Sequence, residues 1–165
     1  MKHIFLVGML VFSGFVLACL DVSDPDVVIQ DAKKIGEKNY LMHLVDDPEK
    51  WIYVLYKIES GNNAWLTVAE MLRSVSDAAT TQALVYSMSF ALKNAPENVL
   101  ARLDKHYSVK AVCGSPFIEE DMHYELGFLK TIRHKVKQAK FKGENQARCL
   151  NHITQQIAAI SVSDP

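Results

Sequence analysis

The sequence has little of what several protein classes require. It contains three cysteines, seven glycines and five prolines in 165 residues, which excludes collagen-like and low-complexity chains. Its formal net charge of −1 is atypical of a nucleic-acid-binding protein, which usually has a strong basic excess. Hydrophobic residues make up 49% of the chain and charged residues 22%, so the composition predicts a folded globular protein. The length suits one domain.

The signatures of common enzymes are also absent from the sequence. The five histidines after residue 18 match no zinc-site spacing, and there is no Walker, Rossmann, kinase or Gly-x-Ser-x-Gly pattern. We therefore expect no metal and no cofactor. Glu119 and His123 could serve a hydrolase or a metal-dependent enzyme if distant groups joined them. An acidic first turn that complements the helix dipole explains the same cluster more simply.

Residues 1–18 have the pattern of a secretory signal peptide. Lys2 is followed by the mostly apolar residues 4–16, and small residues at Val16 and Ala18 match a signal-peptidase site. The apolar run is short for a membrane span, although an uncleaved anchor remains the alternative. The sequence therefore predicts export from the cytoplasm.

The residues Val16-Leu17-Ala18-Cys19 resemble the lipobox of bacterial lipoprotein precursors. The resemblance implies cleavage before Cys19 and lipid attachment to its sulfur. Leu20 stands where an Asp would favour the inner membrane, so the resemblance points to the outer membrane. Residues 19–24 would then form a short tether, whereas ordinary cleavage at the same bond would release a free periplasmic protein.

Cys113 and Cys149 are the other two cysteines. Exported chains enter an oxidising compartment in which cysteine pairs persist, so we expect a disulfide between them. This pairing leaves Cys19 over, and lipidation accounts for it. Two buried free thiols are the alternative for Cys113 and Cys149.

Residues 25–162 are expected to form a single all-α domain, a compact bundle of six or seven helices with one disulfide. Asp-Pro pairs predict helix starts at Asp24 and Asp47, and glycines predict stops at Gly36 and Gly61. The expected helices cover residues 25–35, 48–61, 63–75, 77–93, 96–106, a long segment from 116 to the break at 143, and a last helix around 149–160. The pairs 48–61 with 63–75 and 77–93 with 96–106 suggest stacked hairpins like those of HEAT-type arrays.

Two surface features are candidates for partner binding. The first is a basic run on the long helix and its exit, represented by Lys130, Arg133, Lys137 and Lys140, which would suit an anionic membrane surface or an acidic protein. The second is a group of aromatic residues in 51–65, among which Tyr53 and Tyr56 are expected to be half exposed. A solvated helix face explains the first feature more simply, and ordinary core packing explains the second more simply. No aromatic residues are interleaved in a way that favours nucleic acid.

The stretch VYSMSFALKNAPENVLARLD, the following VCGSPFIE and a later cysteine resemble small exported helical proteins of proteobacteria, of unassigned function. The resemblance covers residues 65–155 and implies a helical fold, export and the Cys113–Cys149 pairing. It lends no catalytic residue.

The sequence therefore favours a non-enzymatic exported binding module, such as an inhibitor, an immunity-type protein or an envelope accessory factor. The partner would be a protein of the cell envelope.

Overall fold

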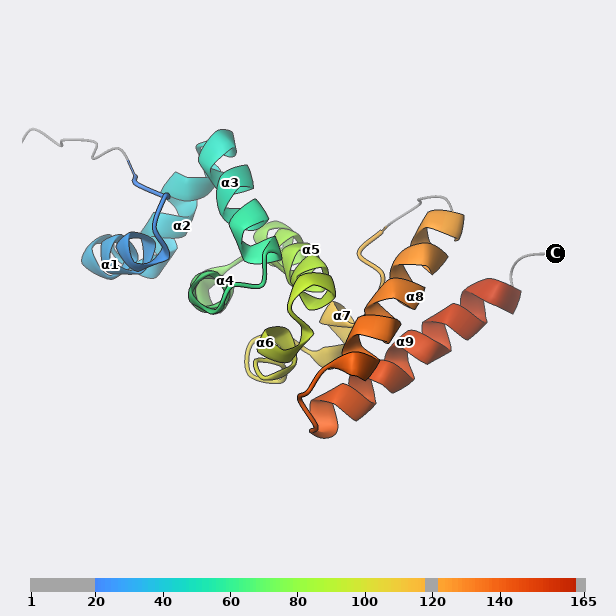
Figure 1. Ribbon diagram of the computed structural model, residues 1–165. Helices are drawn as coiled ribbons and strands as arrows, with labels where there is room; N and C mark the ends of the chain where they lie inside the picture. Colours follow the sequence, from blue (N-terminus) through green and yellow to red (C-terminus); the bar gives the residue numbers. More distant parts are fainter. Residues whose placement is uncertain (1–19, 118–121, 163–165) are drawn as a thin grey trace, which may run out of the picture.

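The computed structural model describes residues 20–117 and 122–162, and these residues form nine helices without a named strand (Figure 1). The expected signal peptide and Cys19 lie outside the described residues, as does Glu119. The all-α prediction is confirmed. The helices are α1 (Pro25–Ile35), α2 (Glu37–Val45), α3 (Pro48–Glu59), α4 (Asn63–Val75), α5 (Ala78–Asn94), α6 (Pro96–Leu100), α7 (Val109–Val112), α8 (Met122–Gln138) and α9 (Glu144–Val162).

Short-range side-chain bonds begin several of these helices where the sequence predicts. The Asp24 carboxylate accepts a hydrogen bond from the Asp26 amide at 2.8 Å, and the Asp47 carboxylate accepts one from the Lys50 amide at 3.2 Å. In both cases the next residue is a proline, whose missing amide hydrogen costs nothing at the first helical position. Asp77 begins α5 with a capping box, in which its carboxylate and the Thr80 side chain each bind the other residue's amide.

Two short helices were not expected. α2 begins immediately after Gly36, whose φ of 89° ends α1 without ending the helical region. It buries Tyr40, Leu41 and Leu44 although it has only nine residues, too few for a clear periodic pattern. α7 lies between the helix predicted over 96–106 and the long helix predicted from 116, where the sequence predicts no helix.

Several helix boundaries differ from the prediction. α8 ends at Gln138, before the expected break at Gly143, and α9 begins at Glu144, before the expected start near Cys149. The helix expected over 96–106 ends at Leu100, and Asp104 adopts a φ of 72°, which a regular helix cannot contain. The long helix does not begin at Pro116, because residues 115–117 are not helical and α8 is described from Met122.

The helices follow one another in chain order from one end of the molecule to the other (Figure 1). The pairs expected as hairpins, α3 with α4 and α5 with α6, are in contact. α3 also packs extensively against α5, and α8 packs along α9 to form a terminal helical hairpin. One contiguous cluster of buried side chains joins α1 to α9, from Val28 to Ile153, and Leu20 and Val22 of the expected tether pack against it.

The expected disulfide joins Cys113, directly after α7, to Cys149 in α9. The two Cα atoms lie 5.4 Å apart, and both residues are fully buried. Further bonds hold the hairpin to the rest of the molecule. The Asn145 amide donates to the Leu100 and Leu103 carbonyls at 3.2 and 3.3 Å.

None of the helices in 20–117 and 122–162 has both the length and the apolar character that a bilayer crossing requires.

Candidate functional site

The outer side of α3 presents two large hydrophobic side chains to solvent. Ile52 is 65% exposed and Tyr56 is 68% exposed, and they lie one helical turn apart. Apart from Val162 near the end of α9, they are the most exposed large hydrophobic residues in the described chain. The opposite side of the same helix buries Val54 and Ile58 completely, so core packing holds α3 in this orientation.

Tyr53, the second predicted aromatic residue, lies differently from Tyr56. Its ring meets the Trp65 ring edge to face, with centroids 6.5 Å apart, and the Lys57 ammonium lies 5.2 Å from its centroid. Trp65 itself is only 6% exposed. Tyr53 therefore packs within the molecule and supports the surface, whereas Tyr56 remains available for contact.

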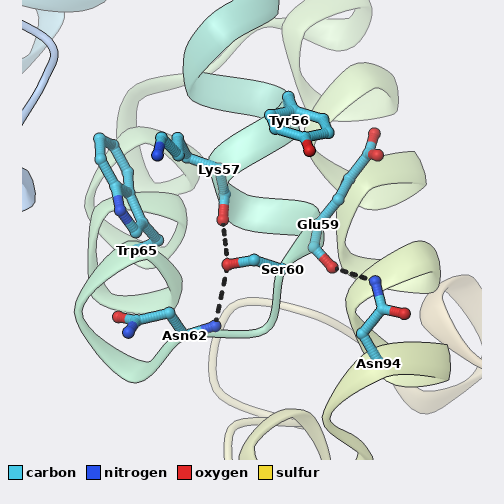
Figure 2. Close-up of a pocket in the computed structure, with 7 residues that line it drawn as sticks. All are labelled: Tyr56, Lys57, Glu59, Ser60, Asn62, Trp65 and Asn94. Atoms are coloured by element: carbon cyan, nitrogen blue, oxygen red, sulfur yellow. Dashed lines mark hydrogen bonds between the residues drawn. The ribbon is translucent and has the colours of Figure 1, made fainter.

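A pocket of about 390 Å³ opens beside Tyr56, where the end of α3 meets the start of α4 and the end of α5 (Figure 2). Tyr56 and Trp65 provide its aromatic groups, and the other lining side chains are polar or charged. The lining residues are Tyr56, Lys57, Glu59, Ser60, Asn62, Trp65 and Asn94.

Most polar groups around this pocket already hold backbone atoms. The Ser60 hydroxyl donates to the Lys57 carbonyl at 2.6 Å and accepts from the Asn62 amide at 3.3 Å. The Asn94 side chain donates to the Glu59 carbonyl at 2.7 Å, as Figure 2 shows. The Asn94 bond ties the end of α3 to the end of α5 across 35 positions of sequence, and the two Ser60 bonds shape the turn that follows α3.

Gly61 allows the chain to turn at the base of this pocket. Its φ is 72°, a left-handed value that favours glycine. A Cβ at this position would collide with the Ala95 side chain and would lie 3.3 Å from the Ala91 carbonyl oxygen. The Asn98 side chain donates to the Gly61 carbonyl at 2.9 Å and secures the turn.

Glu59 is the acidic residue of the pocket, and it lies partly buried near α5. Burial raises the pKa of the Glu59 carboxyl above its usual value, and a hydrogen bond with Ser87 opposes this shift. The carboxylate is thus a partly desolvated acceptor next to an exposed tyrosine. Such a combination suits the binding of a polar or basic group from a partner.

The described residues provide no group of three histidine, cysteine or acidic side chains that could hold a metal ion. His123 is exposed in the first turn of α8. Its expected companion Glu119 lies outside the described residues, so the structure does not place the two together.

The predicted basic residues lie on and just after α8, far along the chain from the pocket. Lys130 and Lys137 are exposed on α8, Arg133 is partly exposed beside them, and Lys140 is exposed in the loop that follows. The Lys140 backbone amide donates to the Glu97 carboxylate at 2.8 Å, which fixes the start of this loop against α6. The two predicted surfaces are therefore separate.

Sequence reasoning found Tyr56 but missed the pocket. Glu59, Asn62 and Asn94 form it only because α3 and α5 pack together, and residues 35 positions apart give no local signal of that contact. The one sequence signal near the pocket is Gly61, which predicts the end of a helix.

Comparison with protein-family models, with curated proteins and with solved structures finds no match to this chain.

Proposed function

We propose that this chain is an exported, non-enzymatic binding module that recognises a protein partner through α3 and the adjoining pocket. The observation that carries the proposal is the exposure of Ile52 and Tyr56 beside that pocket. Aromatic and large apolar side chains next to a recess are the usual anchors of protein–protein interfaces, because their burial removes much apolar surface from water.

The polar groups of the pocket support binding rather than chemistry. The Ser60 hydroxyl and the Asn94 amide bond to backbone carbonyls, so they hold the surface in shape. A catalytic nucleophile instead needs a base within hydrogen-bonding reach. An inhibitor, an immunity-type protein or an envelope accessory factor would use a recognition surface whose shape is held by such bonds.

The Cys113–Cys149 disulfide is consistent with export, because such bonds persist in oxidising compartments. In this proposal the chain resides in the periplasm, or at the outer membrane if Cys19 carries lipid. Cell fractionation and the mass of the purified native protein test both statements. Cytosolic precursor with all three thiols open to alkylation would refute export, and the bare mass of residues 19–165 would refute lipidation.

The binding surface can be tested in living cells with a photo-crosslinking phenylalanine analogue at position 56. Tyr124 on α8 offers a matched control site, because it is also a highly exposed tyrosine, at 62%. We expect one discrete protein adduct from position 56 and none from position 124. The absence of an adduct, or the same adducts at both positions, would refute the proposed surface.

Once the partner is purified, Tyr56→Ala should weaken binding by about 1.5–2 kcal/mol, or about tenfold to thirtyfold in Kd. The unfolding midpoint should be unchanged, because the Tyr56 side chain is largely in solvent. Calorimetric titration and thermal unfolding measure the two quantities. An unchanged Kd would show that the partner binds elsewhere.

A further inference from the structure

The solvent side of α8 carries positive charge in a line. Lys130, His134 and Lys137 are all exposed and are spaced by four and three residues, so they follow one face of the helix for about 10 Å. Arg133 and Lys135 flank this line. We call these five residues, together with Lys140 and Lys142 of the next loop, the basic face.

The cations of the basic face form no ion pair with any part of the chain that the structure describes. The four ion pairs found in 20–117 and 122–162 involve Lys34, Lys50, Arg102 and Arg148. Neighbouring like charges on a helix repel one another, and no ion pair within the described residues offsets this repulsion on α8. An external anion would relieve it.

The distribution of charge strengthens this contrast. Residues 130–148 contain seven Lys and Arg against one acid, a formal net charge of +6, whereas the whole stretch 118–165 contains the same seven against six acids. Residues 20–117 contain ten Lys and Arg against thirteen acids, a formal net charge of −3. Figure 1 shows α1 and the α8–α9 hairpin at opposite ends of the molecule, so the positive charge is concentrated at one end. The acidic residues 119–121 precede α8 and lie outside the described residues, and the basic face is therefore defined only from Lys130 onward.

The side chains between the cations favour a diffuse anionic surface over a specific protein pocket. The exposed residues of 126–140 are Gly127, Lys130, His134, Lys135, Lys137, Gln138 and Lys140, none of which is a large apolar residue. Protein interfaces usually bury aromatic or large apolar anchors, whereas polybasic faces bind anionic lipid by charge alone. We propose that the basic face of α8 docks on the phosphate headgroups of an anionic phospholipid bilayer. This docking is independent of the α3 surface.

Lysine footprinting of the full chain tests the proposal locally, so that membrane contact by any other segment does not obscure it. The native protein is acetylated with an amine-reactive ester alone, with phosphatidylcholine vesicles and with phosphatidylglycerol vesicles, and each lysine is quantified by mass spectrometry. Lys33 and Lys38, exposed at the other end of the molecule, are internal controls. In about 20 mM salt we expect phosphatidylglycerol to slow acetylation of Lys130 and Lys137 by about fivefold and to leave the controls unchanged.

Two further conditions make the result decisive. About 0.5 M salt should restore the reactivity of Lys130 and Lys137, because it screens exposed charges. The charge reversals Lys130→Glu and Lys137→Glu together should abolish protection of Lys140 by phosphatidylglycerol, whereas Lys33→Glu with Lys38→Glu should leave it intact. Equal protection of all lysines, no protection, or salt-resistant protection would overturn the proposal. Protection by polyglutamate but not by phosphatidylglycerol would overturn it in favour of an acidic protein partner.

Discussion

The part of the chain from α1 to α6 and the part from α7 to α9 are held in place by different kinds of interaction. In the first part, helices begin at side chains such as Asp24, Asp47 and Asn62, which bond amides two or three positions away. In the second part, the Cys113–Cys149 disulfide joins residues 36 positions apart. The comparison shows that hydrogen bonds between distant residues, such as Asn94 to Glu59, join the helices of the first part, whereas a covalent cross-link joins those of the second.

Removal of the disulfide should affect the second part most strongly. In the chain-entropy model, a closed loop of this length contributes about 4 kcal/mol, so the double variant Cys113→Ala and Cys149→Ala should lose about that much unfolding free energy. Denaturant unfolding measures the loss, and a reductant should have no further effect on the variant. Hydrogen exchange should accelerate in α9 more than in α3. Equal acceleration in both helices would contradict the contrast between the two parts.

Two glycines offer a matched test, one in each part. Gly61→Ala should destabilise the protein by about 1–3 kcal/mol, because Gly61 has a φ of 72° and a Cβ there would collide with Ala95. Gly127→Ala on α8 should stabilise it by about 0.5–1 kcal/mol, because Gly127 is helical and nothing lies within 4 Å of its added Cβ. Thermal unfolding of both variants checks the opposite signs. A stabilising Gly61→Ala would show that the pocket turn is not constrained.

Two fully buried tyrosines should respond oppositely to loss of their hydroxyl groups. The Tyr107 hydroxyl donates to the Ala69 carbonyl at 2.9 Å, so Tyr107→Phe should cost about 1 kcal/mol. The Tyr40 hydroxyl is buried and has no hydrogen-bond partner among the described residues. Tyr40→Phe should therefore be neutral or stabilise the protein by up to about 1 kcal/mol. Equilibrium unfolding at neutral pH measures both, and equal losses would contradict the assignment.

Tyr40 also predicts that the free energy of unfolding depends on pH in the alkaline range. Burial raises the pKa of Tyr40 to about 12, with a further contribution from the negative charge of Asp31, whereas an unfolded tyrosine ionises near pH 10. Above pH 10 the unfolded chain therefore binds fewer protons than the native chain, and stability falls as the pH rises towards 12. Tyr40→Phe should make this fall shallower. An unchanged slope would show that Tyr40 ionises similarly in both states.

Much of the helical organisation could be predicted from sequence because its signals are local. Asp24-Pro25 and Asp47-Pro48 mark helix starts correctly, and Gly36 marks the end of α1. The helix predicted over 96–106 was too long, because no residue near Asp104 signals the positive φ of that residue.

The candidate site was less predictable than the fold. The sequence predicts that Tyr56 is a surface aromatic residue, but it makes the same prediction for Tyr53. Only the position of Trp65 against α3 makes one ring packed and the other exposed.

By itself, the sequence determined the helical character of the chain, most helix starts and the excess of positive charge after residue 122. These properties depend on residues within a few positions of one another. Only the tertiary structure decided that Asn94 would meet the end of α3 and that the cations of the basic face would form no ion pair among the described residues. Those outcomes depend on how the helices pack, because packing brings together, or keeps apart, residues that are distant in the chain.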